Sequence, residues 1–324
     1  MLKADKRKVL ITGINGFIGS HLARTLLDKG FEIHGISRSP RQTPYLKGIP
    51  ELERIHLHAG DILDVGFLSE LFALHEFEGV FHLASQSDTW KSTQNPTETW
   101  DVNVNGTLNL METLRERKTD TRVLVMSSVR VFHSSSSTHG DPELIQLHPY
   151  DASKWSAEML SASYFHTYGM NGVIARCTNV YGPNDYNFSR LIPRIMKGMF
   201  VDHKIRLMGD GQLKRDFMHV SDTVCGLIAM YEQIPSPRVK GKSLTLATGK
   251  SYSIREMVNF LQDESGTKIL VEWEETTSMH DRDQQGIDIQ ETRNVLNWEA
   301  KMGIREGLRD TMKWYQEYFR EAKS

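Results

Sequence analysis

Tyr150 and Lys154 are the residues of this sequence whose types and spacing most clearly permit chemistry. They are four positions apart, and Ser128 precedes them at the end of an apolar run. On a helix such positions share a face, so the phenol and the ammonium lie side by side. A free phenol has a pKa of about 10 and is a poor base at neutral pH, but a neighbouring cation favours the phenolate. The tyrosine can then accept or return a hydroxyl proton while Ser128 hydrogen-bonds the same oxygen, so we predict that these three residues are catalytic.

A glycine-rich turn near the amino terminus predicts a phosphate-binding site. The strand-like run from Lys8 to Thr12 leads through Gly13-Ile14-Asn15-Gly16-Phe17-Ile18-Gly19 into a helix-like stretch that ends near Lys29. Glycine permits backbone angles and close approaches that a Cβ forbids, and the N–H groups at a helix start attract a pyrophosphate. The spacing differs from the common Gly-x-Gly-x-x-Gly, and the turn alone also fits a tight connection without a ligand. With the Tyr-Lys pair it predicts a dinucleotide cofactor. The residues expected to contact it are Gly13, Asn15, Gly16, Phe17, Ile18 and Gly19.

The end of the predicted second strand indicates which dinucleotide to expect. In an NAD site a carboxylate at this place binds the adenine ribose, but the segment here reads Gly35-Ile36-Ser37-Arg38-Ser39. Arg38 can bind a 2′-phosphate through charge-assisted hydrogen bonds, and Ser37 avoids the repulsion of an aspartate. We therefore predict NADP(H), with NAD possible if Arg38 is only a solvated loop charge. Asp61 and Ile62, after the third strand, are expected to contact the adenine, although Asp61 fits a helix cap equally well.

Alternating strand-like and helix-like segments in the first half of the chain must position these residues. The alternation predicts βαβ units and a Rossmann-type doubly wound parallel sheet, hence an α/β fold. Further strands are expected at 31–36, 54–58, 80–84, 122–126 and 173–176, and helices at 97–117 and 150–168. A serine-rich stretch, 134–137, precedes the Tyr150 helix, and we expect a mobile active-site loop there.

After Asn179 the order of elements becomes less regular. Helices are expected near 189–198 and 222–231, with a strand near 205–208, and prolines at 235 and 237 mark a loop before small α/β pieces and a final helix. A chain of 324 residues exceeds one modal domain. We predict a dinucleotide-binding domain with the catalytic residues at 1–178. Residues 179–324 are expected to form mainly a smaller carboxy-terminal α/β substrate lobe, with some segments returning to the first domain.

Composition restricts the partners and the compartment. Hydrophobic residues make up 39% of the chain, charged residues 25%, and the net charge is −2, as in an ordinary globular protein. Neither sign of charge dominates, so no nucleic acid or membrane partner is expected. No apolar run is long enough to span a bilayer, and the basic amino terminus leads into a strand rather than a signal peptide. The two cysteines, Cys177 and Cys225, are interpreted as reduced core residues of a cytoplasmic protein.

Several further motifs resemble those of a known family and occur in its order along nearly the whole chain. They are the glycine turn, His82-Leu83-Ala84-Ser85, Asn103-Val104-Asn105-Gly106-Thr107, the Ser128, Tyr150 and Lys154 set, Asn179-Val180-Tyr181-Gly182-Pro183, and Arg215-Asp216-Phe217-Met218-His219-Val220. Together they resemble the extended short-chain dehydrogenases/reductases of the nucleotide-sugar epimerase/dehydratase kind. The stretches at 35–38 and 84–87 are most similar to the GDP-mannose 4,6-dehydratase and 4-keto-reductase branch.

The resemblance implies a nucleotide-diphosphate sugar as the substrate. Asn179 would meet its diphosphate, and Arg215 and Arg282 would clamp the phosphates, because the planar guanidinium binds phosphate oxygens in pairs. Either arginine could instead form a surface ion pair. The implied cofactor contacts are Leu83, Ala84, Ser85, Tyr150 and Lys154. The implied substrate contacts are Gln86, Ser87, Ser128, Asn179, Arg190, Arg215 and Arg282.

The residues after Ser128 bear on which reaction is expected. The 4,6-dehydratases of this family carry one or two carboxylates there, which serve as acid and base, but this chain has Val129-Arg130-Val131-Phe132. Loss of water needs both groups, so we predict hydride transfer at C4, as a 4-epimerase or a 4-keto-sugar reductase. The alternatives are a dehydratase that uses Asp88 or Glu143, and a non-catalytic NADP-binding scaffold or sensor, which would not need the three catalytic residues.

Two remaining expectations concern metal ions and assembly. The histidines at 82, 133, 139 and 148 match no metal-ligand spacing, so no metal is expected. Relatives pair the helices near 97–117 and 150–168 into a dimer interface, which implies a homodimer. The apolar residues available for this interface, which could equally be core, are Trp155, Met159 and Leu160.

Overall fold

The computed structural model describes residues 7–39, 44–47, 52–118, 120–131, 148–274 and 286–322. The chain divides into two compact units, one formed by 1–177 with 227–245 and the other by 178–226 with 246–324. The serine-rich stretch, Glu143 and Arg282 lie outside the described residues. Within the described ranges, no helix combines the length and the apolar character needed to cross a membrane.

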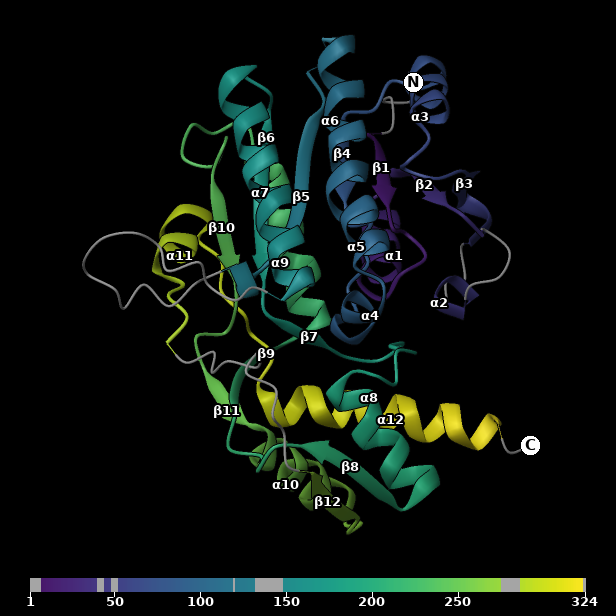
Figure 1. Cartoon of the computed structure of the whole chain (residues 1–324), viewed down its shortest axis with the longest axis vertical. Coiled ribbons are helices and arrows are strands. Elements are labelled where there is room, and N and C mark those ends of the chain that lie inside the picture. Colours follow the sequence, from purple (N-terminus) through teal and green to yellow (C-terminus); the bar gives the residue numbers. More distant parts are fainter. Residues whose placement is uncertain are drawn as a thin grey trace. The chain divides into compact units, whose positions relative to one another are not determined.

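A seven-stranded sheet forms the centre of the first unit (Figure 1). Its order is β10-β6-β5-β4-β1-β2-β3, and β1 to β6 pair in parallel. The predicted parallel sheet is therefore confirmed, and the order 3-2-1-4-5-6 places the topological switch point between β1 and β4. The strands are β1 (Lys8–Thr12), β2 (Glu32–Ser37), β3 (Ile55–Ala59), β4 (Gly79–His82), β5 (Arg122–Ser128), β6 (Gly172–Cys177) and β10 (Ser243–Leu246).

Helices cover both faces of this sheet. On one face, Leu68, Leu110 and Phe165 from α3, α6 and α7 form a buried core with residues of the central strands. On the other face, α9 packs Tyr231 against Phe81 of β4. The helices of the unit are α1 (Phe17–Asp28), α2 (Pro44–Lys47), α3 (Val65–Leu74), α4 (Thr89–Gln94), α5 (Pro96–Trp100), α6 (Gly106–Arg117) and α7 (Pro149–Thr167), and α9 (Val220–Gln233) begins in the second unit.

The long helix expected at 97–117 is interrupted. A π-helical turn, Asp101–Asn105, separates α5 from α6. Such turns widen the helix by one residue and often occur at functional sites. The buried residue of the turn is the polar Asn103, which a pattern of apolar spacing does not count, so the sequence did not reveal the turn.

In its described residues, the second unit contains two small sheets and the helices α8, α10, α11 and α12. The sheets have the orders β11-β9-β7 and β12-β8, and their residues enclose a core with the amphipathic α10 and α12. The elements are β7 (Asn179–Tyr181), α8 (Leu191–Lys197), β8 (Lys204–Met208), β9 (Lys214–His219), β11 (Ser251–Ser253), α10 (Ile254–Ser265), β12 (Leu270–Glu274), α11 (Gln290–Leu296) and α12 (Ile304–Glu321).

The interpretation of the two cysteines as core residues is correct for Cys177 and wrong for Cys225. Cys177 is buried at the end of β6, whereas Cys225 is exposed on α9. The apolar residues on either side of Cys225, Val224 and Gly226, are buried, and a helix turns consecutive residues to different faces. The composition of the neighbourhood therefore misled the prediction.

Candidate active site

The glycine turn brings main-chain atoms close together where a side chain would not fit. Gly13 directly follows β1 and has a φ of +72°, and a Cβ there would lie 2.8 Å from the main-chain nitrogen of Ala84. A Cβ on Gly19 would lie 2.2 Å from the carbonyl oxygen of Gly13. Helix α1 begins at Phe17, with Gly16 as its N-cap, no capping side chain and no acid in the first turn. This leaves a positive helix end open to an anion, so the turn fits the phosphates of a dinucleotide.

A buried hydrogen-bond chain joins the two strands of the switch point. Ala84 N donates to Thr12 Oγ1 at 3.1 Å, and Thr12 Oγ1 lies 2.8 Å from Nδ1 of His82. On its other side, Nε2 of His82 lies 2.9 Å from Oγ1 of Thr107. Because Thr107 donates to the carbonyl of Asn103, its oxygen must accept from His82. Burial lowers the pKa of His82 to about 3, so a neutral ring holds the predicted cofactor segment Leu83–Ala84 against β1.

Ser37 and Arg38, the residues predicted to favour NADP over NAD, lie at the end of β2. Asn15 Nδ2 donates to Ser37 Oγ at 2.8 Å, and Ser39 N donates to the same oxygen at 3.1 Å. Ser37 is buried and Arg38 is exposed. The structure thus joins the glycine turn to Ser37 and leaves the Arg38 side chain in solvent, where it can reach a ligand.

Asp61 and Ile62 follow β3. Asp61 Oδ1 accepts from Leu63 N at 3.0 Å, but the N-cap of α3 is Asp64, whose carboxylate accepts from Phe67 N. The reading of Asp61 as a helix cap is therefore wrong. Ile62 buries its side chain, and a Cβ on Gly106 would lie 2.4 Å from its Cδ1. Their contact with adenine stays a prediction.

Helix α7 carries Tyr150 and Lys154 and is bonded firmly to the sheet. Lys154 Nζ donates to the carbonyl of Met126 in β5 at 2.8 Å. One turn further on, the buried Glu158 accepts from Ser127 of β5 at 2.8 Å and from Nε of Arg176 in β6 at 2.8 Å. Burial lowers the pKa of Lys154 to about 8. These bonds fix the face of α7 that carries the predicted catalytic residues beside the end of β5, where Ser128 lies.

Arg130 lies two residues after Ser128, in the segment where the sequence resemblance predicts a carboxylate for a dehydratase. Ser128 Oγ accepts from the main-chain nitrogen of Arg130 at 3.2 Å. The Arg130 guanidinium binds both oxygens of Asp151, Nε to Oδ1 at 2.6 Å and Nη2 to Oδ2 at 3.1 Å. Asp151 follows Tyr150 directly, so this ion pair joins the segment after Ser128 to the first turn of α7.

Asn103, in the π-helical turn, belongs to a motif quoted from the sequence, but the sequence predicted no role for its side chain. Its Oδ1 accepts from Ser85 Oγ at 2.9 Å and from Gln86 N at 2.8 Å, while its Nδ2 donates to Gln86 O at 3.1 Å and to Ser153 Oγ at 2.9 Å. Ser153 in turn donates to the carbonyl of Tyr150 at 2.7 Å. One buried amide thus fixes the segment after β4 relative to the Tyr150 turn. Gln86 is buried and Ser87 is exposed.

The predicted substrate residues of the second unit are already engaged with its own framework. Asn179 Nδ2 donates to the carbonyl of Asp216, next to Arg215 on β9. Arg190 pairs through Nη1 with the buried Asp185 at 3.1 Å. Asn179 and Arg215 therefore lie on paired strands, whereas Arg190 lies at the start of α8. Arg282 lies outside the described residues.

This strand order, combined with a helix that carries Tyr-x-x-x-Lys, defines an extended short-chain dehydrogenase/reductase. Comparison with known proteins agrees: the family model described as GDP-mannose 4,6 dehydratase matches residues 10–311, and the chain belongs to that family. The resemblance inferred from the sequence motifs is thereby confirmed.

Three relatives illustrate the range of the family. The chain is 29% identical to a UDP-glucuronate 4-epimerase of Thermodesulfobacterium geofontis, over 97% of this chain and 98% of the relative. It is 28% identical to a dTDP-glucose 4,6-dehydratase of Streptomyces griseus, over 96% and 94%. A crystal structure of UDP-glucuronic acid 4-epimerase from Bacillus cereus, in complex with UDP-glucuronic acid and NAD, is 26% identical over 96% and 99%, with a TM-score of 0.83. The relatives thus include two of the three reactions weighed from the sequence, 4-epimerisation and 4,6-dehydration.

Proposed function

We propose that this protein is an NADP-dependent enzyme that transfers hydride at C4 of a nucleotide-sugar, as a 4-epimerase or a 4-keto-sugar reductase. The observation that carries the proposal is the placement of Ser128, Tyr150 and Lys154 on β5 and α7, with Arg130 in place of an acid after Ser128. The 4-epimerases among the relatives support the site of the reaction on the sugar.

In this proposal each catalytic residue has a distinct task. The bound dinucleotide supplies the hydride acceptor and donor. Tyr150 takes the proton of the C4 hydroxyl or returns it, because its phenol lies one helical turn from the Lys154 ammonium. Lys154 stabilises the phenolate, and its hydrogen bond to Met126 O keeps the ammonium in place. Ser128 hydrogen-bonds the same sugar oxygen and orients the developing carbonyl.

A 4,6-dehydratase is the second candidate, favoured by the description of the family model and by the Streptomyces griseus relative. That reaction needs a base for the C5 proton and an acid for the C6 hydroxyl. Asp151 is engaged through both oxygens by Arg130, and Asp88 caps α4 by accepting from Lys91 N at 3.1 Å. Among the described residues, neither of these two carboxylates is arranged as an available acid, which favours the C4 reaction, whereas Glu143 lies outside the described residues.

The preference for NADP is supported by the end of β2. Ser37 and the exposed Arg38 stand where an NAD site carries a carboxylate. The Bacillus cereus epimerase was crystallised with NAD, which supports a nicotinamide dinucleotide as the cofactor. The preference for NADP over NAD depends on Ser37 and Arg38 alone.

A turnover assay tests the proposal. Purified protein is incubated with NADP or NAD and with GDP-, CDP-, UDP- and dTDP-hexoses or a 4-keto-6-deoxy sugar nucleotide, while nicotinamide absorbance and product mass are followed. A product of unchanged mass identifies an epimerase, and NADPH consumption with a ketosugar identifies a reductase. Loss of water from a hexose would make the protein a dehydratase. Binding of NADPH without any turnover across the panel would favour the scaffold.

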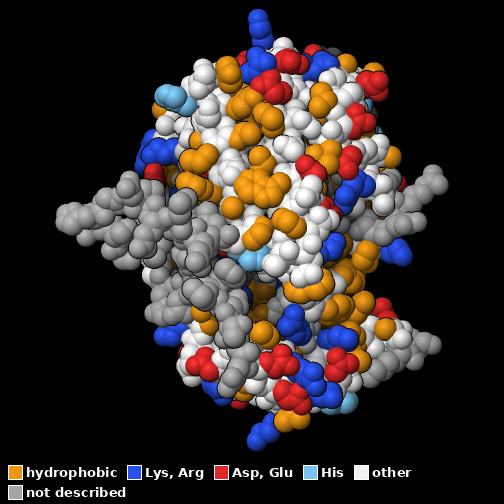
Figure 2. Space-filling model, viewed as in Figure 1, with side chains coloured by type: hydrophobic (Ala, Val, Ile, Leu, Met, Phe, Trp, Pro, Cys, Tyr) orange, Lys and Arg blue, Asp and Glu red, His pale blue; other side chains and the backbone are white. Residues whose placement is uncertain are grey.

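We further propose a homodimer in the cytoplasm. Trp100 of α5 and Trp155 and Met159 of α7 are large apolar side chains that remain exposed. Figure 2 shows hydrophobic side chains gathered on the face where Figure 1 places α5 and α7. A patch of this kind favours association with a second copy through a two-fold axis, and sedimentation of the wild type and of Trp155→Ser tests it.

A further inference from the structure

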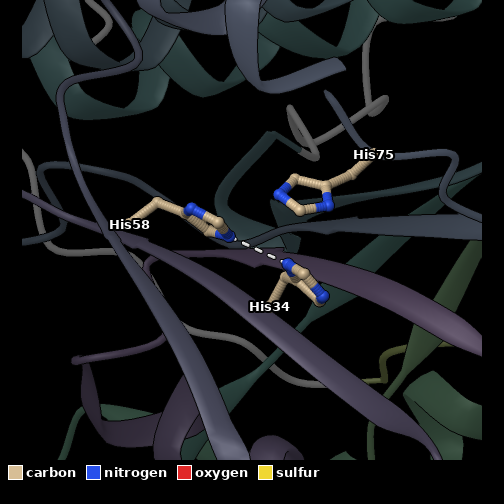
Figure 3. Close-up of side chains that lie close together, drawn as sticks. All are labelled: His34, His58 and His75. Carbon is tan, nitrogen blue, oxygen red and sulfur yellow. Dashed lines mark hydrogen bonds between the residues drawn. The ribbon is translucent and has the colours of Figure 1, made fainter. Parts of the chain in front are cut away.

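A cluster of histidines lies on the edge of the sheet, away from the predicted catalytic residues. His34 of β2, His58 of β3 and His75, just after α3, each offer a ring nitrogen, and these three nitrogens lie within 4.8 Å of one another. Figure 3 shows His34 and His58 directed toward each other, with His75 beside them. The proposed function assigns no role to any of the three.

The strand register explains why the rings meet. His34 pairs with His56 and Ile36 pairs with His58 in the parallel β2–β3 ladder. Side chains two residues apart share a face of a sheet, so Glu32 and His34 of β2 and His56 and His58 of β3 point to the same side. His75 reaches that side from the end of α3, with a ring centroid 4.7 Å from that of His34.

The hydrogen bonds of His34 resemble those of a metal ligand. Its Nε2 lies 3.0 Å from Oε1 of Glu32, and its Nδ1 lies 2.8 Å from Nε2 of His58. Since the carboxylate oxygen of Glu32 accepts this hydrogen bond, Nε2 of His34 carries the proton. The lone pair of Nδ1 therefore faces His58. A carboxylate that orients a ring in this way is the usual outer partner of a metal-bound histidine.

We propose that His34, His58 and His75 bind a divalent transition metal of the zinc type, with Glu32 holding His34 in the ligating tautomer. Three imidazoles without a thiolate suit Zn²⁺, Ni²⁺ or Cu²⁺, and the hard cation Mg²⁺ prefers oxygen ligands. A tetrahedral Zn²⁺ with bonds of about 2.0–2.1 Å separates two ligand nitrogens by about 3.3 Å, so the observed 2.8 Å pair needs to open by only about 0.5 Å.

The exposure of the three rings also agrees with metal binding. His34 is buried, whereas His58 and His75 are partly exposed. A metal can therefore reach the cluster from solvent, and a water molecule can occupy the fourth position.

The test is metal binding by the tag-free, chelator-treated full-length protein. We expect one Zn²⁺ per chain by calorimetry, a Tm raised by about 5 °C at a hundredfold excess over Kd, and visible ligand-field absorption of four-coordinate Co²⁺. His58→Gln and His75→Gln should each reduce the affinity at least tenfold. Mg²⁺ should leave Tm unchanged.

Two controls decide between this site and weaker surface binding. His166→Gln removes an exposed histidine of α7, and His56→Gln removes the ring of the neighbouring set of Glu32, His34 and His56. Both variants should bind Zn²⁺ like the wild type. The proposal is overturned if the wild type binds no Zn²⁺, if His58→Gln and His75→Gln keep full affinity while circular dichroism shows them folded, or if only His56→Gln loses it.

Discussion

Arg130 binds Asp151 through two parallel hydrogen bonds, Nε to Oδ1 at 2.6 Å and Nη2 to Oδ2 at 3.1 Å. Their side chains are 18% and 12% exposed, so solvent screens the pair only in part. The pair joins the residues that follow Ser128 to the residue that follows Tyr150. It therefore acts on the relative position of two predicted catalytic groups as well as on stability.

Replacing Arg130 should disturb both properties. We expect Arg130→Met to lower the free energy of unfolding by about 1–3 kcal/mol, because Asp151 loses its charged partner in a largely buried position. In a double-mutant cycle by urea unfolding, Arg130→Met with Asp151→Asn should cost less than the sum of the single changes. Strict additivity would mean that the ion pair contributes nothing.

Tyr150→Phe should abolish turnover, by about a thousandfold or more, because no other group takes the hydroxyl proton. The affinity for NADPH, measured by fluorescence titration, should stay within a few-fold of that of the wild type. Tyr168→Phe, at the exposed end of the same helix, is the matched control and should be fully active. Activity in Tyr150→Phe would refute the proposed mechanism.

The sequence could predict features that depend on local spacing, such as the turn at Gly13. It could not predict features that depend on strand register, such as the histidine cluster around His34. The spacing of Gly13, Tyr150 and Lys154 is local and the parallel sheet follows from alternating patterns, so the fold and the place of the glycine turn were predictable, whereas the roles of the three residues stay predictions. His34, His58 and His75 lie on three elements and meet only through the register of β2 and β3. The spacing of residues along the chain does not determine that register. The π-helical turn was missed because its buried residue is the polar Asn103, which apolar spacing does not count.

Because burial lowers the pKa of Lys154, the free energy of unfolding should depend on pH. The pKa of Lys154 falls from an ordinary value of 10.5 to about 8 in the folded protein, so between these values the unfolded chain binds a proton that the folded chain lacks. Stability should then rise with pH across this window, by up to about 3 kcal/mol. Urea unfolding of the cofactor-free protein at pH 7.5 and 9.5 measures the change, with Lys154→Met as the background. An equal change in both proteins would exclude this titration.

Arg38→Ala should weaken binding of NADPH by about tenfold or more while changing NADH affinity little, because only NADPH carries the 2′-phosphate that a guanidinium can bind. Arg24→Ala removes an exposed arginine of α1 and should leave both affinities unchanged. The measurement is a fluorescence titration of both reduced dinucleotides. Equal losses for NADPH and NADH would refute the assignment of the 2′-phosphate to Arg38.

Asn103→Ala should lower both stability and activity. The change removes four hydrogen bonds to Ser85, Gln86 and Ser153, three of them buried, and the partners left unsatisfied cost about 2–4 kcal/mol in total. Since Ser153 bonds to the carbonyl of Tyr150, kcat should fall more than KM rises. Asn105→Ala, in the same π-helical turn but exposed and bonded only to Asp101 Oδ1 among the described residues, should change neither by much. Equal effects of the two substitutions on kcat would show that the turn matters only as a structural element, whereas a kcat defect confined to Asn103→Ala identifies Asn103 as the residue that positions Tyr150.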